Sequence, residues 1–273
     1  MLTLDSRAGT AFLKFGRNGS GTILERCFAT SPVKVFATKG GESACWAYTA
    51  TLGGGIVGGD DIHMTIEVAD ASRALLTTQA STKVYRSLRP ARQVLSAEVG
   101  ARALLVVAPD PIVCFSGADF AQRQRYELRG DASLVVVDWM TSGRHATGER
   151  WAFSRYESRV AITRDGRPVF NDALVLEHDL DSIADRMGRF DAFLTAIVMG
   201  PLVSHGAEKV RDWIAGQAIA RDADLMLSAS TLNDGGVLLR MAGTSVEQVG
   251  RTIRNSLDFL PALLGDDPWS RKW

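Results

Sequence analysis

The chain has 273 residues, with 31 basic and 31 acidic side chains and a hydrophobic share of 46%. This length allows one large all-β domain or two ordinary domains, and either can bury a sizeable core. The balanced charge offers no electrostatic footprint for a nucleic-acid backbone or an anionic membrane surface. We therefore expect protein or small-ion partners, and neither nucleic acid nor membrane.

The cysteines and the chain start indicate a reducing compartment. Cys27, Cys45 and Cys114 are widely spaced and form no C-x-x-C motif, which argues against a disulfide scaffold or a structural zinc site. The N-terminus lacks the pattern of a signal peptide, and no apolar run is long enough to span a bilayer. We expect free, mostly buried thiols in a soluble cytoplasmic protein.

The first distinctive segment is a glycine-rich turn at residues 52–60, which contains Gly53-x-Gly55-x-x-Gly58. A dinucleotide fingerprint requires such glycines to follow a strand and open a helix. Here they precede residues 62–68, where apolar and polar side chains alternate with the period of a half-buried strand. The glycines are therefore expected to supply positive-φ positions in a bulged connection rather than a phosphate cradle.

Three segments resemble one another at a spacing of about thirty residues, a range typical of repeat architectures. They begin at Glu67, Glu98 and Glu127, and each consists of a strand end, a small polar turn and a new apolar strand. Such units favour a stack of β-layers, as in a β-solenoid or a long sandwich. An ordinary antiparallel all-β protein also produces partial matches of this kind by chance. Further strands are expected at residues 122–128, 134–140 and 151–163, with no strong domain boundary within residues 1–273.

The pattern changes after about residue 202. Residues 204–220 predict a helix with Ser204 as N-cap and Trp213 on its apolar face. A hairpin is expected over residues 225–241, with its turn at 233–236. In residues 244–264, apolar side chains recur at three and four residues behind a Thr244-x-x-Glu247 capping box, which predicts one helix. We expect its apolar stripe to pack under the β-layers, and the helix, hairpin and helix to occupy residues 202–265.

The sequence nominates no catalytic residue. No G-x-S-x-G elbow or comparable signature of a nucleophile is present. Glycan hydrolysis by a carboxylate pair is the enzymatic alternative, with Asp60, Asp61, Asp138 and Glu149 available. Acids on loops are more often solvated turn residues.

The metal-binding side chains are scattered, without an H-x-x-x-H motif or a His-rich tract, so we expect no tight metal site. A transient path for a divalent ion could use carboxylate and imidazole groups. The residues available for it are Asp60, His63, His145 and Glu149.

Four segments in the same order resemble the urease accessory proteins of the UreD family, also called UreH. They are residues 52–60 (LGGGIVGGD), 76–85 (LTTQASTKVY), 109–115 (PDPIVCF) and 138–151 (DWMTSGR, then GERW). The resemblance covers about residues 10–200. The chain end at 267–273 departs from the family's pattern.

This resemblance implies a non-enzymatic scaffold that binds apo-urease together with a UreF-type protein and a UreG-type GTPase. Such a scaffold helps to insert nickel into the urease metallocentre. GTP would be bound by the GTPase partner, no cofactor would be held tightly, and nickel would be handled transiently, along a route proposed for the family through the protein interior. The implied fold is an elongated β-helix-like stack of strands over residues 10–200, with two α-helices in the C-terminal third.

Within this framework, the glycine turn at residues 53–60 and the strand at residues 78–85 are expected to shape a polar interior or an interface. The residues concerned are Thr78, Gln79, Thr82, Lys83 and Tyr85. They carry more polar groups than a β-core layer accommodates, and buried polar groups need partners. An exposed strand with an ordinary hydrogen-bonded ladder is the alternative.

The aromatic tail at residues 266–273 contains Trp269 and Trp273. Aromatic residues at a terminus either dock on the domain or contact a partner. We expect the late helices and this tail at the interface with the UreF-type protein. A glycan-active β-stack enzyme and a generic β-rich binding module remain the alternative functions.

Overall fold

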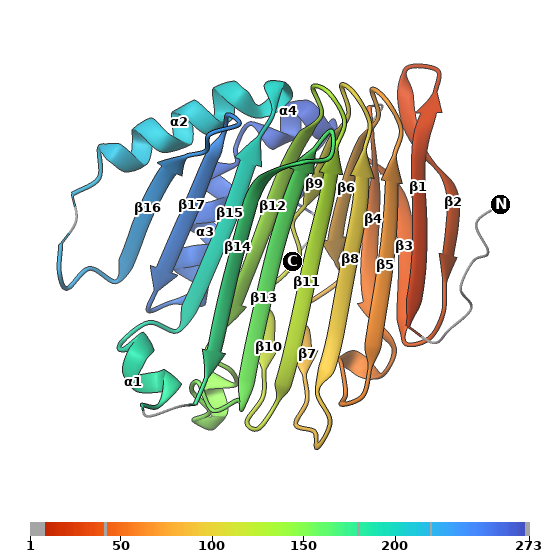
Figure 1. Ribbon diagram of the computed structural model, residues 1–273. Coiled ribbons are helices and arrows are strands. Elements are labelled where there is room, and N and C mark those ends of the chain that lie inside the picture. Colours follow the sequence, from red (N-terminus) through yellow and green to blue (C-terminus); the bar gives the residue numbers. More distant parts are fainter. Residues whose placement is uncertain (1–8, 41–42, 179–180, 219, 271–273) are drawn as a thin grey trace.

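The structure is a computed structural model that describes residues 9–40, 43–178, 181–218 and 220–270. Two mixed β-sheets lie face to face, and helices cover the outer side of one of them (Figure 1). The predicted mainly β class is confirmed, whereas the β-helix-like description stays a prediction.

The first sheet has seven strands in the order β14-β13-β11-β8-β5-β1-β2. Its members are β1 (Thr10–Asn18), β2 (Gly21–Ala29), β5 (Asp61–Val68), β8 (Ala91–Val99), β11 (Asp119–Leu128), β13 (Arg155–Arg164) and β14 (Arg167–Glu177). Strands β1, β5, β8, β11 and β13 run parallel, and the two outermost pairs are antiparallel. Strand β5 alternates buried and accessible side chains, which confirms the strand predicted at residues 62–68.

The second sheet has ten strands, with the main order β16-β17-β15-β12-β9-β6-β4-β3. Its members are β3 (Val33–Gly40), β4 (Ala44–Thr51), β6 (Arg73–Thr78), β7 (Thr82–Val84), β9 (Leu104–Val107), β10 (Ile112–Cys114), β12 (Ser133–Thr141), β15 (Ala192–Met199), β16 (Leu225–Thr231) and β17 (Val237–Gly243). Strands β4, β6, β9 and β12 are parallel neighbours. The predicted hairpin near the chain end is confirmed as β16 and β17.

The three similar segments lie in register on neighbouring strands. Glu67 of β5 pairs with Glu98 of β8, and Glu98 pairs with Glu127 of β11. The turns that follow are also joined, because Asp70 Oδ1 accepts a hydrogen bond of 2.9 Å from the backbone N–H of Ala101 in the next turn. The recurrence in the sequence therefore corresponds to successive layers of the two sheets.

Two hydrophobic clusters hold the layers together. The larger one lies between the sheets, and the other lies between the ten-stranded sheet and the helices. All four residues of β9 are buried, two on each face, as expected of a strand covered on both sides. Of the cysteines, Cys45 and Cys114 are buried and Cys27 is exposed, and all three thiols are free.

Four helices are present in the described part of the chain. They are α1 (Ile183–Met187), α2 (Ser204–Ala215), α3 (Val246–Ser256) and α4 (Leu260–Leu264). The predicted number of two is wrong, because α1 was not foreseen and the last predicted helix divides into α3 and α4. Its apolar stripe is buried as predicted, with Val249, Ile253 and Leu257 in the outer cluster. No helix within the described ranges has the length and apolar character that crossing a bilayer requires.

Two details of the helix ends also differ from the predictions. The N-cap of α2 is Val203, since the 3-10 turn η3 (Pro201–Val203) leads directly into the helix at Ser204. The N-cap of α3 is Ser245, whose side chain accepts from the backbone N–H of Gln248. On α2, Trp213 is 43% exposed rather than buried.

Candidate functional site

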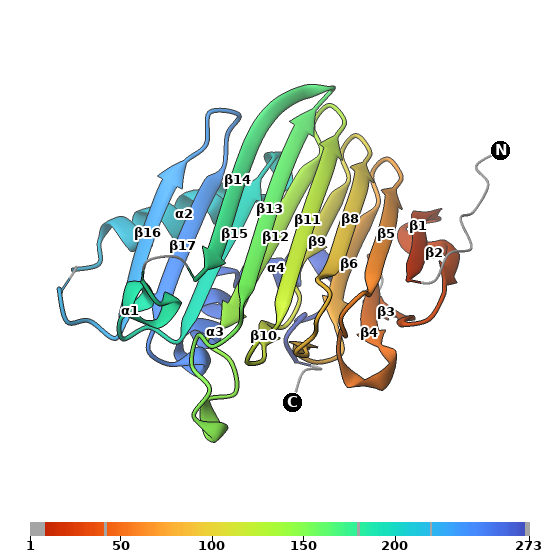
Figure 2. The ribbon, with the colours of Figure 1, turned by 60° about the horizontal axis from the view of Figure 1, so that its bottom comes forward.

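The four motif segments meet at one end of the sandwich, the lower end in Figure 1. Ile56 of the glycine turn forms a parallel bridge with Val84 of β7. Strand β7 pairs with β10, and β10 pairs with the end of β12. Trp139 Nε1 donates a hydrogen bond of 2.9 Å to the carbonyl of Pro109, which ties the fourth segment to the third. Figure 2 brings this end of the molecule forward.

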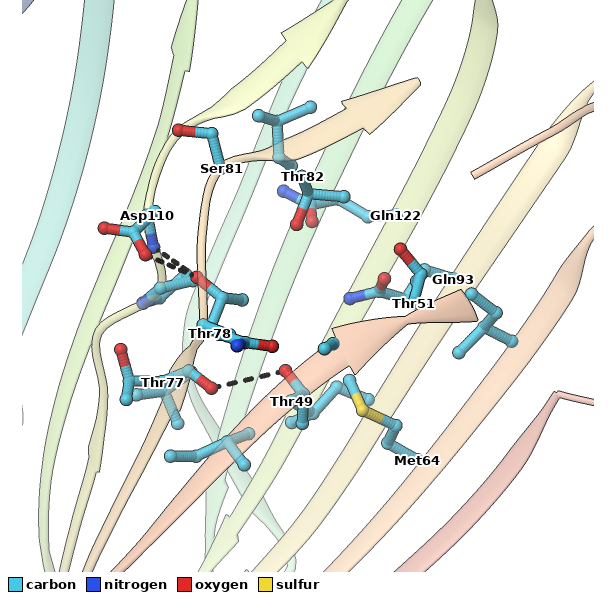
Figure 3. Close-up of a pocket in the computed structure, with 18 of the residues that line it drawn as sticks. Thr49, Thr51, Met64, Thr77, Thr78, Ser81, Thr82, Gln93, Asp110 and Gln122 are labelled. Atoms are coloured by element: carbon cyan, nitrogen blue, oxygen red, sulfur yellow. Dashed lines mark hydrogen bonds between the residues drawn. The ribbon is translucent and has the colours of Figure 1, made fainter. Parts of the chain in front are cut away.

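Beside this junction, a cavity of about 190 Å³ lies between the two sheets (Figure 3). Apolar side chains such as Met64, Leu76 and Ile112 form part of its wall. The polar part of the lining consists of Thr49, Thr51, Thr77, Thr78, Gln79, Ser81, Thr82, Gln93, Asp110, Gln122, Gln124 and Asp138. The sandwich therefore contains a space with both polar and apolar walls at the end where the motifs converge.

The threonines on one wall are held by hydrogen bonds across the sheet. Thr78 Oγ donates to Asp110 Oδ2 at 3.0 Å and accepts from the Asp110 backbone N–H at 2.8 Å (Figure 3). Thr77 Oγ donates to the carbonyl of Ala108 at 2.6 Å, and Thr49 Oγ donates to the carbonyl of Thr77 at 3.2 Å. These bonds satisfy buried hydroxyl groups and fix their orientation.

Asp138 is the centre of a second hydrogen-bond network. Gln122 Nε2 lies 2.7 Å from Asp138 Oδ1, 3.0 Å from Ser158 Oγ and 3.1 Å from the Tyr156 hydroxyl. Ser158 Oγ donates to the other carboxylate oxygen, Oδ2. Gln93, Gln122 and Ser158 are register partners on β8, β11 and β13, so one polar row crosses the inner face of the seven-stranded sheet.

Burial controls the protonation of this network. It raises the pKa of the Asp138 carboxyl above its usual range, while the hydrogen bonds from Ser158 and Gln122 act in the opposite direction. Burial also raises the pKa of Tyr156 well above its usual value, and the nearby Asp138 charge adds to that shift. A carboxylate in this environment gains from any cation that replaces its lost hydration.

A second, smaller cavity of about 10 Å³ adjoins the same carboxylate. Asp138 and Trp139 line both cavities. On the far side, the small cavity is lined by Asp172 and Thr195. Asp138 therefore stands between two internal spaces of the sandwich.

Only some of the polar residues predicted to shape an interior or an interface line the large cavity. Thr78, Gln79 and Thr82 line the large cavity, whereas Lys83 and Tyr85 are outside its lining. Lys83 is exposed. Tyr85 packs edge-on against Phe115, with ring centroids 5.0 Å apart.

The residues predicted for a transient metal path are not brought together. Asp60 Oδ2 accepts a hydrogen bond of 2.9 Å from the Val57 backbone N–H. His63 is exposed and lies 3.1 Å from Asp61 Oδ1. His145 Nε2 lies 3.5 Å from Asp191 Oδ2. Within the described ranges, no three His, Cys, Asp or Glu side chains form a metal-binding group.

Glu149, the fourth residue of that path, is engaged in an ion pair. Its carboxylate accepts from Arg144 and, at 3.2 Å, from the Ser116 backbone N–H. The hydrogen bond from Arg144 is the largest cause of the lowered pKa of Glu149. The Arg144 guanidinium also lies 4.4 Å from the centroid of the Phe115 ring, so Glu149 orders the loop rather than facing the cavity.

Trp269 is partly buried and packs against the outer hydrophobic cluster. Its backbone N–H donates to Asp267 Oδ1 at 2.9 Å. Trp273 lies outside the described residues. The predicted contact of this tail with a partner stays a prediction.

No local sequence pattern predicts a common site for Asp138, Gln122 and Ser158. A usable signal was present, because Asp138 interrupts the apolar run of residues 134–140. In β11, the buried Gln122 and Gln124 alternate with the exposed Arg123 and Arg125. A carboxylate within an apolar strand is rarely buried without partners.

A sequence model of the family described as "UreD urease accessory protein" matches residues 7–273. This chain belongs to the UreD family. A "Urease accessory protein UreD" from Sorangium cellulosum is 48% identical over 267 residues, which cover 98% of this chain and 85% of the relative. A protein of the same name from an Anaeromyxobacter strain is 40% identical over 97% of this chain and 90% of its own length. "Urease accessory protein D" from Arabidopsis thaliana is 34% identical over 92% of this chain and 96% of its own length. The UreD resemblance predicted from the four motifs is thereby confirmed.

Proposed function

We propose that this chain is a urease maturation factor that acts without catalysing a reaction of its own. Its membership of the UreD family and the names of its relatives support this role. We infer a cytoplasmic complex with apo-urease, a UreF-type protein and a UreG-type GTPase, in which GTP is bound and hydrolysed by the GTPase. In this complex the chain serves as a scaffold for the insertion of nickel into the urease metallocentre.

We infer further that nickel passes through the cavity between the sheets. The observation that carries this inference is the position of Asp138, which lines both cavities and is surrounded by hydroxyl and amide groups. One carboxylate among neutral oxygen donors binds a borderline divalent ion only weakly. Weak binding suits a conduit, since an ion that is held tightly cannot leave.

The burial of Asp138 is a second reason for a cation to pass beside it. Burial favours the neutral carboxyl, whereas a neighbouring cation favours the carboxylate. A divalent ion beside Asp138 would therefore offset part of the cost of burying its charge. The path predicted through Asp60, His63, His145 and Glu149 stays a prediction; none of the four lines the cavity, so the proposal centres on Asp138.

Substitution of Asp138 tests the conduit. Asp138→Asn keeps the size of the side chain and removes its charge, so urease activity and its nickel content should fall about tenfold. Co-purification of the partner proteins should be unchanged. The control is Asp131→Asn, in a surface turn where Asp131 only accepts from the Arg102 backbone N–H. Normal nickel loading with Asp138→Asn would reject the conduit.

The acids predicted for glycan hydrolysis do not converge on one cavity of the described structure. That reaction needs two carboxylates that face one substrate. In the described part of the chain, Asp138 lines the interior, Asp61 lies beside His63 on the outer face, and Glu149 is paired with Arg144. The large cavity is lined by Asp110 as well as Asp138, so glycan hydrolysis stays an alternative.

A further inference from the structure

Three aliphatic side chains are exposed at the end of the molecule where the motifs meet. Leu52 and Val57 belong to the glycine turn and are 42% and 51% exposed, while Leu88 in the loop before β8 is 102% exposed. Clustered exposed apolar residues on a folded protein commonly mark an interaction site. Neither the cavity nor the metal path described above uses these three side chains.

The two loops that carry them are joined by backbone hydrogen bonds. The N–H of Ile56 donates to the carbonyl of Lys83 at 2.7 Å, and the N–H of Tyr85 donates to the carbonyl of Ile56 at 2.9 Å. Further along, the N–H of Gly59 donates to the carbonyl of Pro90 at 3.3 Å. The loops therefore form one platform with a defined geometry.

The glycines of the turn allow this close approach. A Cβ atom added at Gly55 would lie 2.7 Å from the Lys83 carbonyl oxygen, and one at Gly58 would lie 2.6 Å from the Arg89 carbonyl oxygen. Both distances are too short for real Cβ contacts, so larger residues would separate the loops. The glycine motif is thus a packing device that holds Val57 and Leu88 on adjoining loops.

Leu88 lies in a turn that hydrogen bonds of the Ser87 side chain hold closed. Ser87 Oγ accepts from the Arg89 backbone N–H at 3.0 Å and donates to the Arg89 carbonyl at 2.8 Å. An apolar side chain on a preformed turn loses little conformational freedom on binding. Leu88 is therefore suited to enter a pocket on a partner.

The charges around these aliphatic residues are basic and unpaired. Lys83, Arg86 and Arg89 are exposed, and none of them forms an ion pair within the described ranges. Of the acids in the motif loops, Glu149 is paired with Arg144, and Asp60 accepts a hydrogen bond from the Val57 backbone N–H of its own turn. A partner surface that carries carboxylates complements this rim.

We propose that Leu52, Val57 and Leu88, with the rim of Lys83, Arg86 and Arg89, form a docking surface, here called the tip surface. Its occupant is a protein that offers a shallow apolar pocket surrounded by acidic side chains. The tip surface adjoins the cavity, because Thr51 and Gly54 on either side of Leu52 line it. The proposal rests on the proposed maturation complex, which supplies the candidate partners, but it does not depend on the nickel conduit.

Binding measurements with the full chain test the tip surface. The probes are purified apo-urease and each accessory protein encoded with it, and the readout is the dissociation constant. Leu88→Asp should weaken the binding of one of these proteins about tenfold or more, and Leu88→Ala should weaken it less. Arg86→Glu combined with Arg89→Glu should weaken it too and flatten its dependence on salt.

The matched control is Phe36→Asp, which places the same charge at another exposed hydrophobic position, 47% accessible on β3. This variant should leave all dissociation constants unchanged. Thermal unfolding confirms that each variant is folded, and Leu88→Ala replaces Leu88→Asp if the latter is not. Unchanged binding of every probe, equal losses with Phe36→Asp, or loss only of self-association in sedimentation would each overturn the proposal. Because binding is measured without nickel, the result is independent of the conduit.

Discussion

Asp138 is the residue on which the proposed conduit depends. Its partners Gln122 and Ser158 lie 16 and 20 residues away in sequence, and they come from the opposite sheet. No local pattern links these three residues, which explains why the sequence alone did not bring them together. The polar character of Thr78, Gln79 and Thr82 was visible locally, because these residues follow one another along a single segment.

The raised pKa of Asp138 predicts a pH dependence of stability. The folded state retains a proton that the unfolded chain, with an ordinary carboxyl, releases near pH 4 (about 3.9 for Asp). The folded state therefore binds more protons, and the contribution of this group to stability falls as pH rises from the unfolded to the folded pKa. Asp138→Asn abolishes this titration, so its free energy of unfolding relative to the native chain should rise over that range. Urea denaturation at a series of pH values measures this difference, and a difference independent of pH would contradict the assignment.

At the scale of elements, periodicity predicted the strands and the layer spacing well. The alternation in residues 62–68 and the recurrence at Glu67, Glu98 and Glu127 both correspond to observed strands and register. The division of the last helix was not visible, because Val249, Ile253, Leu257, Leu260 and Leu264 all face the same hydrophobic cluster across the break. Pro261 was the available signal, since proline is tolerated in the first turn of a helix and not in its interior.

The start of α3 allows a direct comparison of two candidate caps. Ser245→Ala removes the side chain that accepts from the Gln248 N–H at 3.2 Å, and should lower the free energy of unfolding by about 1 kcal/mol. Thr244→Ala is the matched control, because the Thr244 hydroxyl only donates to Asp224 Oδ1 at 3.2 Å on the surface. Its effect should be smaller in the same urea denaturation experiment. A larger loss with Thr244→Ala would restore the capping box expected from the sequence.

At the scale of the whole molecule, the features proposed to be functional gather at one end of the two sheets. The four motif segments, the polar cavity and the exposed aliphatic residues all lie there, brought together by β7, β10 and the glycine turn. The order of the motifs was enough to identify the family. It did not predict that the motifs converge, because their convergence depends on pairing between strands that are far apart in the sequence. The recurrence in the sequence likewise did not predict the antiparallel pairs β1–β2 and β13–β14 at the edges of the first sheet.

The most direct test of the account is urease activity at limiting nickel, in cells that express the urease subunits and the other accessory proteins. The cells are compared with and without this chain, and the nickel content of the purified urease is measured alongside. The account predicts that active, nickel-loaded urease appears only when the chain is present. Equal activity and nickel content in its absence would contradict the proposed role in urease maturation.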